Sequence, residues 1–348
     1  MVTLEVIRES NSRISSQLPP GLVAVFVGAT SGIGETTLKQ FVKSAREPRV
    51  YFVGRSETAA ARIKAQLTQL NPQGDYTFIQ SDVSLLKNVD DVCRDIRARE
   101  AAINVLFIST GTLVSGSKTS EDLHFFASLT YYSRVRFIIN LLPHIDRATS
   151  LRRVVTVFAG TKEGPVRTDD FPGLHVGMAA ARGHFSTMIT LALESLAKKA
   201  PRISFIHDYP GFVKTGLARG TKGPAMAVMI GVSKAIGAFL NIPFEEVGER
   251  QVFFLTSGRF PPLDEESSGA GVSLAQGVQL ASGADGKLGS GVYSVDFRGE
   301  TGSAKVYELL AGMRKDGFSD QVWRHTEEAF IRVTGAFRYD IGKIAISM

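Results

Sequence analysis

The sequence predicts an α/β protein in which a parallel sheet of about seven strands lies between two layers of helices. Three observations support this prediction. Strand-like and helix-like segments alternate six times before residue 212. The strand-like segments are apolar runs rich in β-branched residues, as expected for strands buried on both faces. The first of them leads directly into a glycine-rich turn and a helix. Such alternation is typical of a doubly wound sheet with crossover helices on both faces.

The bounds of the elements follow from the apolar pattern and from the residues that break it. The first twenty residues form a helical N-terminal extension that ends at Pro19 and Pro20. Strands are expected at 22–29, 50–55, 76–82, 103–110, 152–160 and 203–211, with a late strand at 289–297. Helices are expected at 33–44, 58–70, 85–97, 128–143 and 185–199.

The regular alternation stops after residue 211. Apolar helical pieces and small-residue loops fill about 212–282, which predicts a helical substrate lid. The chain ends in helical segments at 305–315 and 321–333. We therefore expect an extension over 1–20, a main domain over 21–300 that includes the lid, and a C-terminal helical extension over 301–348.

Composition and charge argue against several classes of protein. The 40 basic and 34 acidic residues give a net charge of +6, but the basic residues are scattered, so no nucleic-acid partner is expected. The single cysteine, Cys93, excludes an internal disulfide and a thiolate metal site, and we expect no metal. There is neither a secretory signal nor an apolar run of about 18 residues, so we expect a cytoplasmic protein without a membrane span.

The turn between the first strand and the first helix carries a G-x-x-x-G-x-G pattern. Glycine lets a backbone turn sharply and approach a pyrophosphate closely, while the start of the helix offers free N–H groups and a partial positive charge. In this position the pattern predicts dinucleotide binding. The residues assigned to it are Gly28, Thr30, Ser31, Gly32, Ile33 and Gly34.

The end of the second strand predicts which dinucleotide binds. An acidic residue there accepts the ribose hydroxyl of NAD, but this strand ends in Gly54 and Arg55, and Glu57 lies beyond its end. A guanidinium pairs well with a 2′-phosphate. Arg55, with its neighbour Ser56, therefore favours NADP(H); a solvated arginine is the alternative interpretation.

Four motifs together carry a resemblance to a known family. They are GATSGIG after the first strand, SDVS after the third, ISTG after the fourth and PGFVKT after the sixth. Over about residues 20–300 the chain resembles the short-chain dehydrogenase/reductases, and SGVYSVDFRGE and QVWRHTEE are similar to the tail of their retinol-dehydrogenase-like branch. The order of motifs also resembles reductase-like proteins of fungal natural-product pathways. The resemblance implies a Rossmann-type fold, a small hydrophobic substrate of secondary metabolism and a homodimer as the candidate assembly.

The resemblance also implies roles for residues along the cofactor. The first two border the adenine, the next passes the ribose and the last four surround the nicotinamide and the pyrophosphate. The implied positions are Asp82, Val83, Gly111, Pro210, Gly211, Val213 and Thr215. One departure lies before Gly111, where Ser109 and Thr110 replace the usual Asn-Ala pair.

The family's catalytic residues have no match. They are an asparagine, a serine, and a tyrosine four residues before a lysine. The asparagine position falls at Thr130 and the serine position at 158–160. The tyrosine and lysine positions fall near Gly177 and Ala181, or at Met178 and Arg182 after a shift of one residue. Loss of a positioned general acid typically costs about 10²–10⁴ in rate.

Four residues are candidates to replace the missing proton donor. Lys162 and Glu163 follow the fifth strand, where ligands gather in open α/β sheets. His184 lies about one turn beyond the lost lysine, and Tyr132 follows the lost asparagine. Each residue also fits a structural role: a solvated ion pair for the first two, and packing for the others.

Three functions remain open at this point. The first is an NADP(H)-dependent oxidoreductase with a non-standard proton donor, acting on a hydrophobic carbonyl, enone or alcohol. The second is a redox-neutral isomerase or cyclase on the same fold. The third is an NADPH sensor without catalysis. Fold alone does not decide among them.

Overall fold

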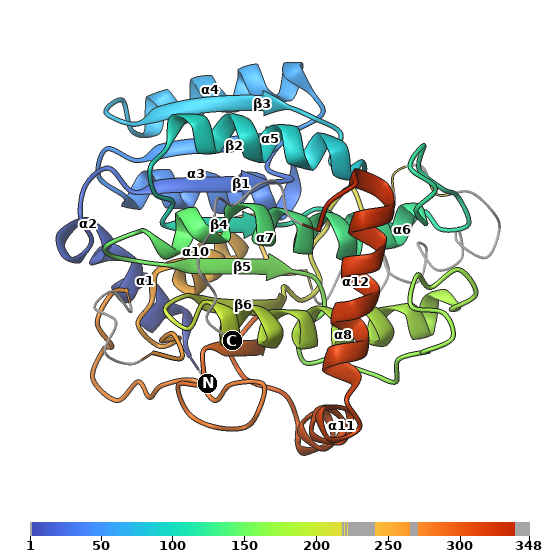
Figure 1. Ribbon diagram of the computed structural model, residues 1–348. Helices are drawn as coiled ribbons and strands as arrows, with labels where there is room; N and C mark the ends of the chain where they lie inside the picture. Colours follow the sequence, from blue (N-terminus) through green and yellow to red (C-terminus); the bar gives the residue numbers. More distant parts are fainter. Residues whose placement is uncertain (1, 218, 220, 222–240, 265–270, 338–348) are drawn as a thin grey trace.

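Parallel strands form a single sheet in the order β3-β2-β1-β4-β5-β6-β7 (Figure 1). The computed structural model describes residues 2–217, 219, 221, 241–264 and 271–337. The strands are β1 (Val23–Val27), β2 (Arg49–Gly54), β3 (Asp75–Gln80), β4 (Val105–Ile108), β5 (Arg153–Val157), β6 (Ser204–Tyr209) and β7 (Val292–Asp296). Every neighbouring pair is parallel, which confirms the predicted doubly wound sheet.

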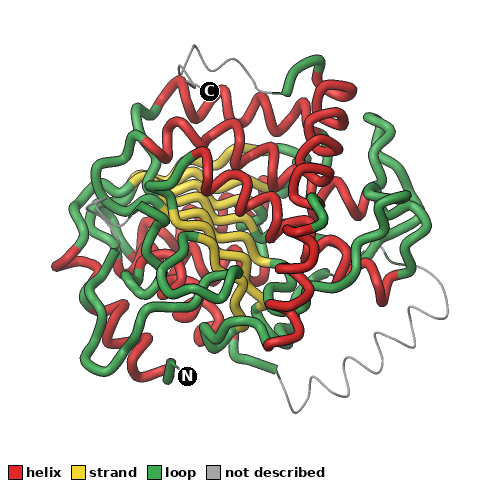
Figure 2. The backbone as a smooth tube through the Cα atoms, turned by 60° about the horizontal axis from the view of Figure 1, so that its bottom comes forward, coloured by secondary structure: helices red, strands yellow, loops and turns green. Residues whose placement is uncertain are grey.

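Helices cover both faces of this sheet, as Figures 1 and 2 show. One layer contains α5 (Leu86–Arg99), α7 (Ser133–Asp146) and α8 (Met178–Lys199), with α12 (Phe318–Thr334) packed against α5 and α8. The other contains α3 (Gly32–Ser44), α4 (Glu57–Leu70), α10 (Phe244–Thr256) and α1 (Leu4–Ser12). The remaining elements are α2 (Ile14–Gln17), α6 (Phe125–Ala127), the π-helix η1 (Ser128–Tyr132) and α11 (Ala304–Lys315).

Two helices extend further than the sequence pattern predicts. The helix α8 begins at Met178, seven residues before the expected start, because the alanines of MAAAR favour helix and the N–H groups of Ala180 and Ala181 both donate to the Gly177 carbonyl. The helix α7 continues past Pro143, whose carbonyl still accepts from the Arg147 N–H. The longer α8 includes positions that the sequence left in a loop.

The segment expected to form the lid is partly described. Residues 222–240 lie outside the described residues. Within the expected range, α10 packs against α3 and α1, in the helical layer beside the sheet. Its buried residues include Val252, Phe253 and Phe254.

The central strands hold the core. All residues of β1, β4 and β5 are buried, whereas the edge strand β3 is only partly buried. The chain moves outward from β1 to β2 and β3, then returns to β4 on the other side of β1. In such sheets, ligands bind at the carboxyl ends of the strands where the order reverses, here between β1 and β4.

A buried ion pair joins α5, α7 and the end of α12. Arg136 donates from Nε and Nη2 to the two carboxylate oxygens of Asp90, at 2.6 and 2.7 Å. The Asn140 side chain donates to the same carboxylate at 2.8 Å. Arg136 also donates to the Phe337 carbonyl at 2.7 Å and to the Thr334 hydroxyl at 3.0 Å. This one side chain therefore fastens the C-terminal helix to the body of the protein.

We expect Arg136→Ala to lower the free energy of unfolding by about 3–5 kcal/mol, because it leaves the buried Asp90 carboxylate without its partner. Denaturant unfolding monitored by circular dichroism measures this loss. The matched control is Arg94→Ala on α5, where the ion pair with Asp91 is about half exposed on both sides. That change should cost about 0–1 kcal/mol. Equal effects of the two substitutions would contradict the structural role of Arg136.

Candidate functional site

The glycine-rich loop after β1 is held by close backbone contacts. Gly28 has φ +84° and Gly32 has φ +61°, both in the left-handed region that favours glycine. A Cβ at Gly28 would lie 2.9 Å from the Thr110 nitrogen, and one at Gly34 would lie 2.4 Å from the Gly28 carbonyl oxygen. The loop needs glycine at these positions because the chain leaving β4 passes directly beside it.

The same loop delivers the first turn of α3. This helix begins at Gly32, and the hydroxyl of its N-cap residue, Ser31, makes no capping hydrogen bond. First-turn N–H groups lack intrahelical partners and favour an anion. Thr30 fills the space beside Gly54, where a Cβ would lie 2.4 Å from the threonine Cγ2, and the half-buried Ile33 packs on the core. The loop is therefore fixed to the end of β2 and shaped for a pyrophosphate.

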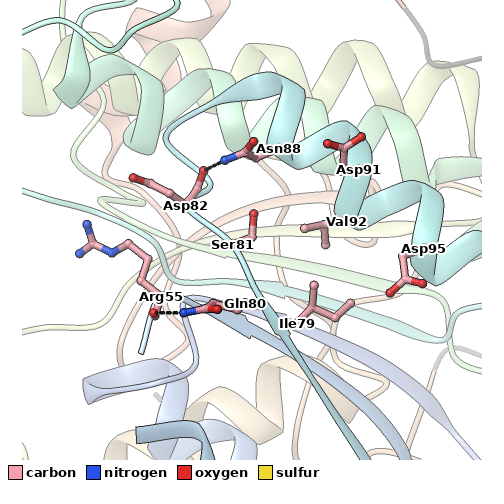
Figure 3. Close-up of a pocket in the computed structure, with 9 residues that line it drawn as sticks. All are labelled: Arg55, Ile79, Gln80, Ser81, Asp82, Asn88, Asp91, Val92 and Asp95. Atoms are coloured by element: carbon pink, nitrogen blue, oxygen red, sulfur yellow. Dashed lines mark hydrogen bonds between the residues drawn. The ribbon is translucent and has the colours of Figure 1, made fainter. Parts of the chain in front are cut away.

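A pocket of about 570 Å³ opens where β2 and β3 end (Figure 3). Its lining residues are Arg55, Ile79, Gln80, Ser81, Asp82, Asn88, Asp91, Val92 and Asp95. The Gln80 side chain donates to the Arg55 carbonyl at 3.1 Å, and the Asn88 side chain donates to the Asp82 carbonyl at 3.0 Å. Arg55 is exposed and is the one cationic residue in this lining.

Two neighbours of this pocket have clear local roles. Ser56 caps α4, since its Oγ accepts from the Ala59 N–H at 3.2 Å. The cap uses the oxygen as an acceptor, so the hydroxyl hydrogen beside Arg55 is available to a ligand. Val83 is buried and belongs to the core on the α5 side of the sheet.

The other end of the site is formed by the segment after β6. Gly211 has φ +77°, and a Cβ there would lie 2.7 Å from Ile242 Cδ1. The segment then crosses to the loop after β4, where the Leu113 N–H donates to the Leu217 carbonyl at 3.1 Å and a Cβ at Gly111 would lie 3.3 Å from Leu217 Cδ1.

This crossing places Thr215 next to the glycine loop, where a Cβ at Gly32 would lie 3.2 Å from the threonine Cγ2. The N–H of Thr215 donates to the Val213 carbonyl at 2.8 Å, and Pro210 is buried before the turn. The loops after β1, β4 and β6 therefore meet at one edge of the sheet. Their close contacts and the open first turn of α3 fit an extended dinucleotide.

The positions of the family's catalytic residues offer no exposed hydroxyl. Thr130 is buried inside the π-helix η1. At the serine position, a Cβ at Gly160 would lie 2.2 Å from the His207 carbonyl oxygen, so no side chain fits. At the start of α8, Gly177 is the N-cap and Ala181 is buried, whereas Arg182 is exposed.

Glu163 points into the protein, although its neighbour Lys162 is exposed. The Glu163 carboxylate accepts hydrogen bonds from the hydroxyls of Thr190 and Ser294, at 2.8 and 2.5 Å. Thr190 in turn contacts His207 Nδ1 at 3.0 Å. Burial raises the pKa of Glu163 and lowers the pKa of His207 to about 3. These groups form a buried polar cluster beneath the ends of β5, β6 and β7.

His184 and Tyr132 are buried as well. His184 accepts from the Arg167 N–H at 3.2 Å and lies 3.1 Å from the Phe171 carbonyl, so both of its ring nitrogens are engaged. Burial lowers its pKa, which keeps the ring neutral. The Tyr132 hydroxyl lies 2.7 Å from His325 Nε2 on α12. These contacts are those of packing residues and leave neither side chain open to a substrate.

A tyrosine outside the predicted site residues lies near two cations. Tyr209 ends β6, directly before Pro210, and is half-buried. Lys162 Nζ lies 5.4 Å from the centre of its ring. Arg182, near the start of α8, acts on it electrostatically. The phenol, the ammonium and the guanidinium come from three different segments, so no local sequence motif predicts that these side chains lie together.

Two buried ionisable side chains lie under the same edge. Arg134 on α7 donates to the Thr156 hydroxyl at 2.6 Å, to the Ile108 carbonyl at 3.2 Å and to the Thr110 carbonyl. Burial lowers its pKa to about 9. Asp208 accepts from the Gln251 side chain at 2.6 Å, and burial raises its pKa to about 7, against the opposing effect of the Arg134 charge.

This fold and this loop define a dinucleotide-binding α/β protein. A family model described as short chain dehydrogenase matches residues 22–145. Oxidoreductase andH of Emericella variicolor is 36% identical over 97% of this chain and 99% of that protein. Short-chain dehydrogenase/reductase SAT2 of Stachybotrys chartarum is 29% identical over 94% of this chain and 96% of that protein. The chain belongs to the short-chain dehydrogenase/reductase family; the retinol-dehydrogenase-like branch stays a prediction.

A solved structure shares the whole fold. The crystal structure of a short-chain dehydrogenase from Streptomyces avermitilis matches with a TM-score of 0.52 and 16% identity, over 89% of this chain and 98% of that one. Among the described residues, no helix is long and apolar enough to cross a membrane. The same residues contain no group of three or more His, Cys, Asp or Glu side chains arranged to hold a metal.

We expect Asp208→Asn to flatten the dependence of stability on pH. The Asp208 pKa rises from 3.8 to about 7 on folding, so the folded protein binds this proton more tightly than the unfolded chain. Its contribution is present below about pH 4 and is lost as pH rises to about 7. The variant should therefore gain stability relative to the wild type between these pH values, by up to a few kcal/mol. Thermal unfolding across this range measures the difference, with the exposed Asp91→Asn as control. Parallel curves for wild type and Asp208→Asn would contradict the assignment.

Proposed function

We propose that the chain is an NADP(H)-dependent oxidoreductase of secondary metabolism that acts on a hydrophobic carbonyl, enone or alcohol. Family membership and the oxidoreductase names of its fungal relatives support the reaction class. The single observation that carries the cofactor choice is the exposed guanidinium of Arg55 in the pocket beyond the end of β2.

The chemistry of the β2 end supports NADP(H) over NAD(H). Gly54, Arg55 and Ser56 follow each other there, and Glu57 belongs to the first turn of α4. No carboxylate therefore ends β2 itself, although Asp82, Asp91 and Asp95 line the same pocket. The guanidinium of Arg55 supplies several N–H donors in a planar fork, and the hydroxyl of Ser56 supplies one more. A 2′-phosphate matches this donor set in charge and in shape.

Exposed apolar side chains support a hydrophobic substrate. Phe212 and Leu217, in the segment that follows β6, are 43% and 44% exposed. Leu217 lies at the crossing between the loops after β4 and β6, and Phe212 directly follows Gly211, one of the positions that the family uses around the nicotinamide. A bound NADP(H) supplies or accepts a hydride there. The side chains of this chain orient an apolar substrate beside it and exclude water.

A second function is favoured by one observation. The start of α8 carries Gly177, Met178 and Ala181 in place of a tyrosine and lysine pair. A redox-neutral isomerase or cyclase needs no phenol at that place and acts by orienting its substrate. Product formation without any change in NADPH absorbance would favour this alternative. Net oxidation of NADPH by a carbonyl or enone compound would favour the oxidoreductase.

We expect Arg55→Ala to weaken NADPH binding about 10- to 100-fold, because charge-assisted hydrogen bonds to the 2′-phosphate contribute about 1.5–3 kcal/mol. NADH binding should change by less than about threefold, within the spread of a single exposed contact. Isothermal titration calorimetry with both cofactors measures the two affinities. The control is Arg202→Ala, an arginine paired with Asp146 outside the site. Equal losses for NADPH and NADH would contradict the role of Arg55, and a wild-type protein that binds neither would contradict the proposed function.

A further inference from the structure

We infer that Tyr209 is the proton donor of this enzyme and that Lys162 and Arg182 stabilise the phenolate that it leaves. This inference rests on the proposed function, because it assigns the proton that a carbonyl reduction requires. The proposed donor lies at the end of the strand β6, whereas the position of the family's tyrosine falls at the start of the helix α8.

The position of Tyr209 follows from the alternation of side chains along β6. His207 faces α8, where its ring contacts the Thr190 hydroxyl at 3.0 Å. Side chains two residues apart in a strand lie on the same face of the sheet. Tyr209 therefore also faces the α8 side, but nearer to the carboxyl edge, where Arg182 lies in the second turn of that helix. Pro210 and Gly211 follow at once and lead into the segment around the predicted nicotinamide site.

The hydroxyl of Tyr209 can reach a substrate, whereas the polar groups of the other candidate donors are bonded within the protein or buried. Within the described residues it makes no hydrogen bond to another protein group, and its side chain is only half-buried. By contrast, the hydroxyls of Tyr131 and Tyr132 are bound to Thr326 and His325 on α12. His184 and Glu163 are both buried beneath the surface of the site.

The two cations fit the change in charge at Tyr209. Burial raises the pKa of the phenol, so the group stays protonated at neutral pH and has a proton to give. Once the proton leaves, the negative phenolate is attracted by the Lys162 ammonium above the ring and by the Arg182 guanidinium. Both cations are exposed at the edge of the sheet, so water can return a proton to the phenolate.

For a carbonyl substrate, the proposed step transfers one hydride and one proton. The carbonyl carbon gains a hydride from NADPH, which is oxidised to NADP⁺, and the C=O double bond becomes a single bond. The oxygen of the substrate takes the proton from the Tyr209 hydroxyl as the phenolic O–H bond breaks. Solvent then reprotonates the phenolate. Alcohol oxidation runs the same transfers in reverse.

The test is an ultraviolet titration of the Tyr209 phenol that needs no substrate. The tyrosinate absorbance of the wild type, minus that of Tyr209→Phe, reports this one hydroxyl across pH. We expect Lys162→Met and Arg182→Met each to raise its pKa by about half a unit to two units, from the loss of one nearby charge. The matched control is Lys198→Met, at the opposite end of α8, which should leave the titration unchanged.

Binding of the two cofactor forms gives the second readout. NADP⁺ carries a positive charge on the nicotinamide that NADPH lacks, so a phenol beside that ring should titrate at lower pH in the NADP⁺ complex. With any carbonyl compound that the wild type reduces, Tyr209→Phe should lower the rate about 10²–10⁴-fold and leave the NADPH affinity unchanged. Normal NADPH binding with the same Tyr209 pKa in both complexes would overturn the assignment of Tyr209 alone. A wild-type protein that binds no NADPH would overturn the proposed function together with it.

Discussion

The parallel direction of the strands is the constraint on which the site depends. Because every strand points the same way, the loops after β1, β4, β5 and β6 all open at one edge of the sheet. The reversal of strand order beside β1 then lets the glycine loop and the chain after β4 touch, with room for no side chain at Gly28. A side chain at that residue would separate the two loops and displace the start of α3. The geometry of the predicted cofactor site therefore depends directly on the topology of the sheet.

Buried ionisable side chains support this edge from below. Arg134 ties the ends of β4 and β5 together through two carbonyls and the Thr156 hydroxyl, at the cost of burying a guanidinium. The carboxyl group of Glu163 accepts hydrogen bonds from the hydroxyls of Thr190 on α8 and Ser294 on β7. Arg134 thereby holds two strand ends in position, and Glu163 joins α8 to β7.

Much of the fold and of the cofactor site follows from local sequence, but the catalytic side of the site does not. The glycine loop could be predicted because strand, turn and helix lie within a few residues, and each glycine has a local reason. The role of Arg55 stays a prediction. Lys162 and Glu163 show the limit. They are adjacent in sequence, yet one is exposed and the other is buried against Ser294, 131 residues away. Tyr132 is likewise bound by His325, 193 residues away. Periodicity carries no information on such pairings.

Tyr209 directly precedes Pro210 and Gly211, so the position of the proposed donor depends on the segment around the predicted nicotinamide site. A donor at the end of β6 is joined to the nicotinamide segment by a single peptide bond. Any shift of Gly211, which is already packed against Ile242, would carry the phenol with it. At the start of α8, the backbone of Gly183 packs directly against the backbone of Gly164. The close packing of Gly183 on Gly164 and the absence of a tyrosine and lysine pair are thus two features of the same helix start.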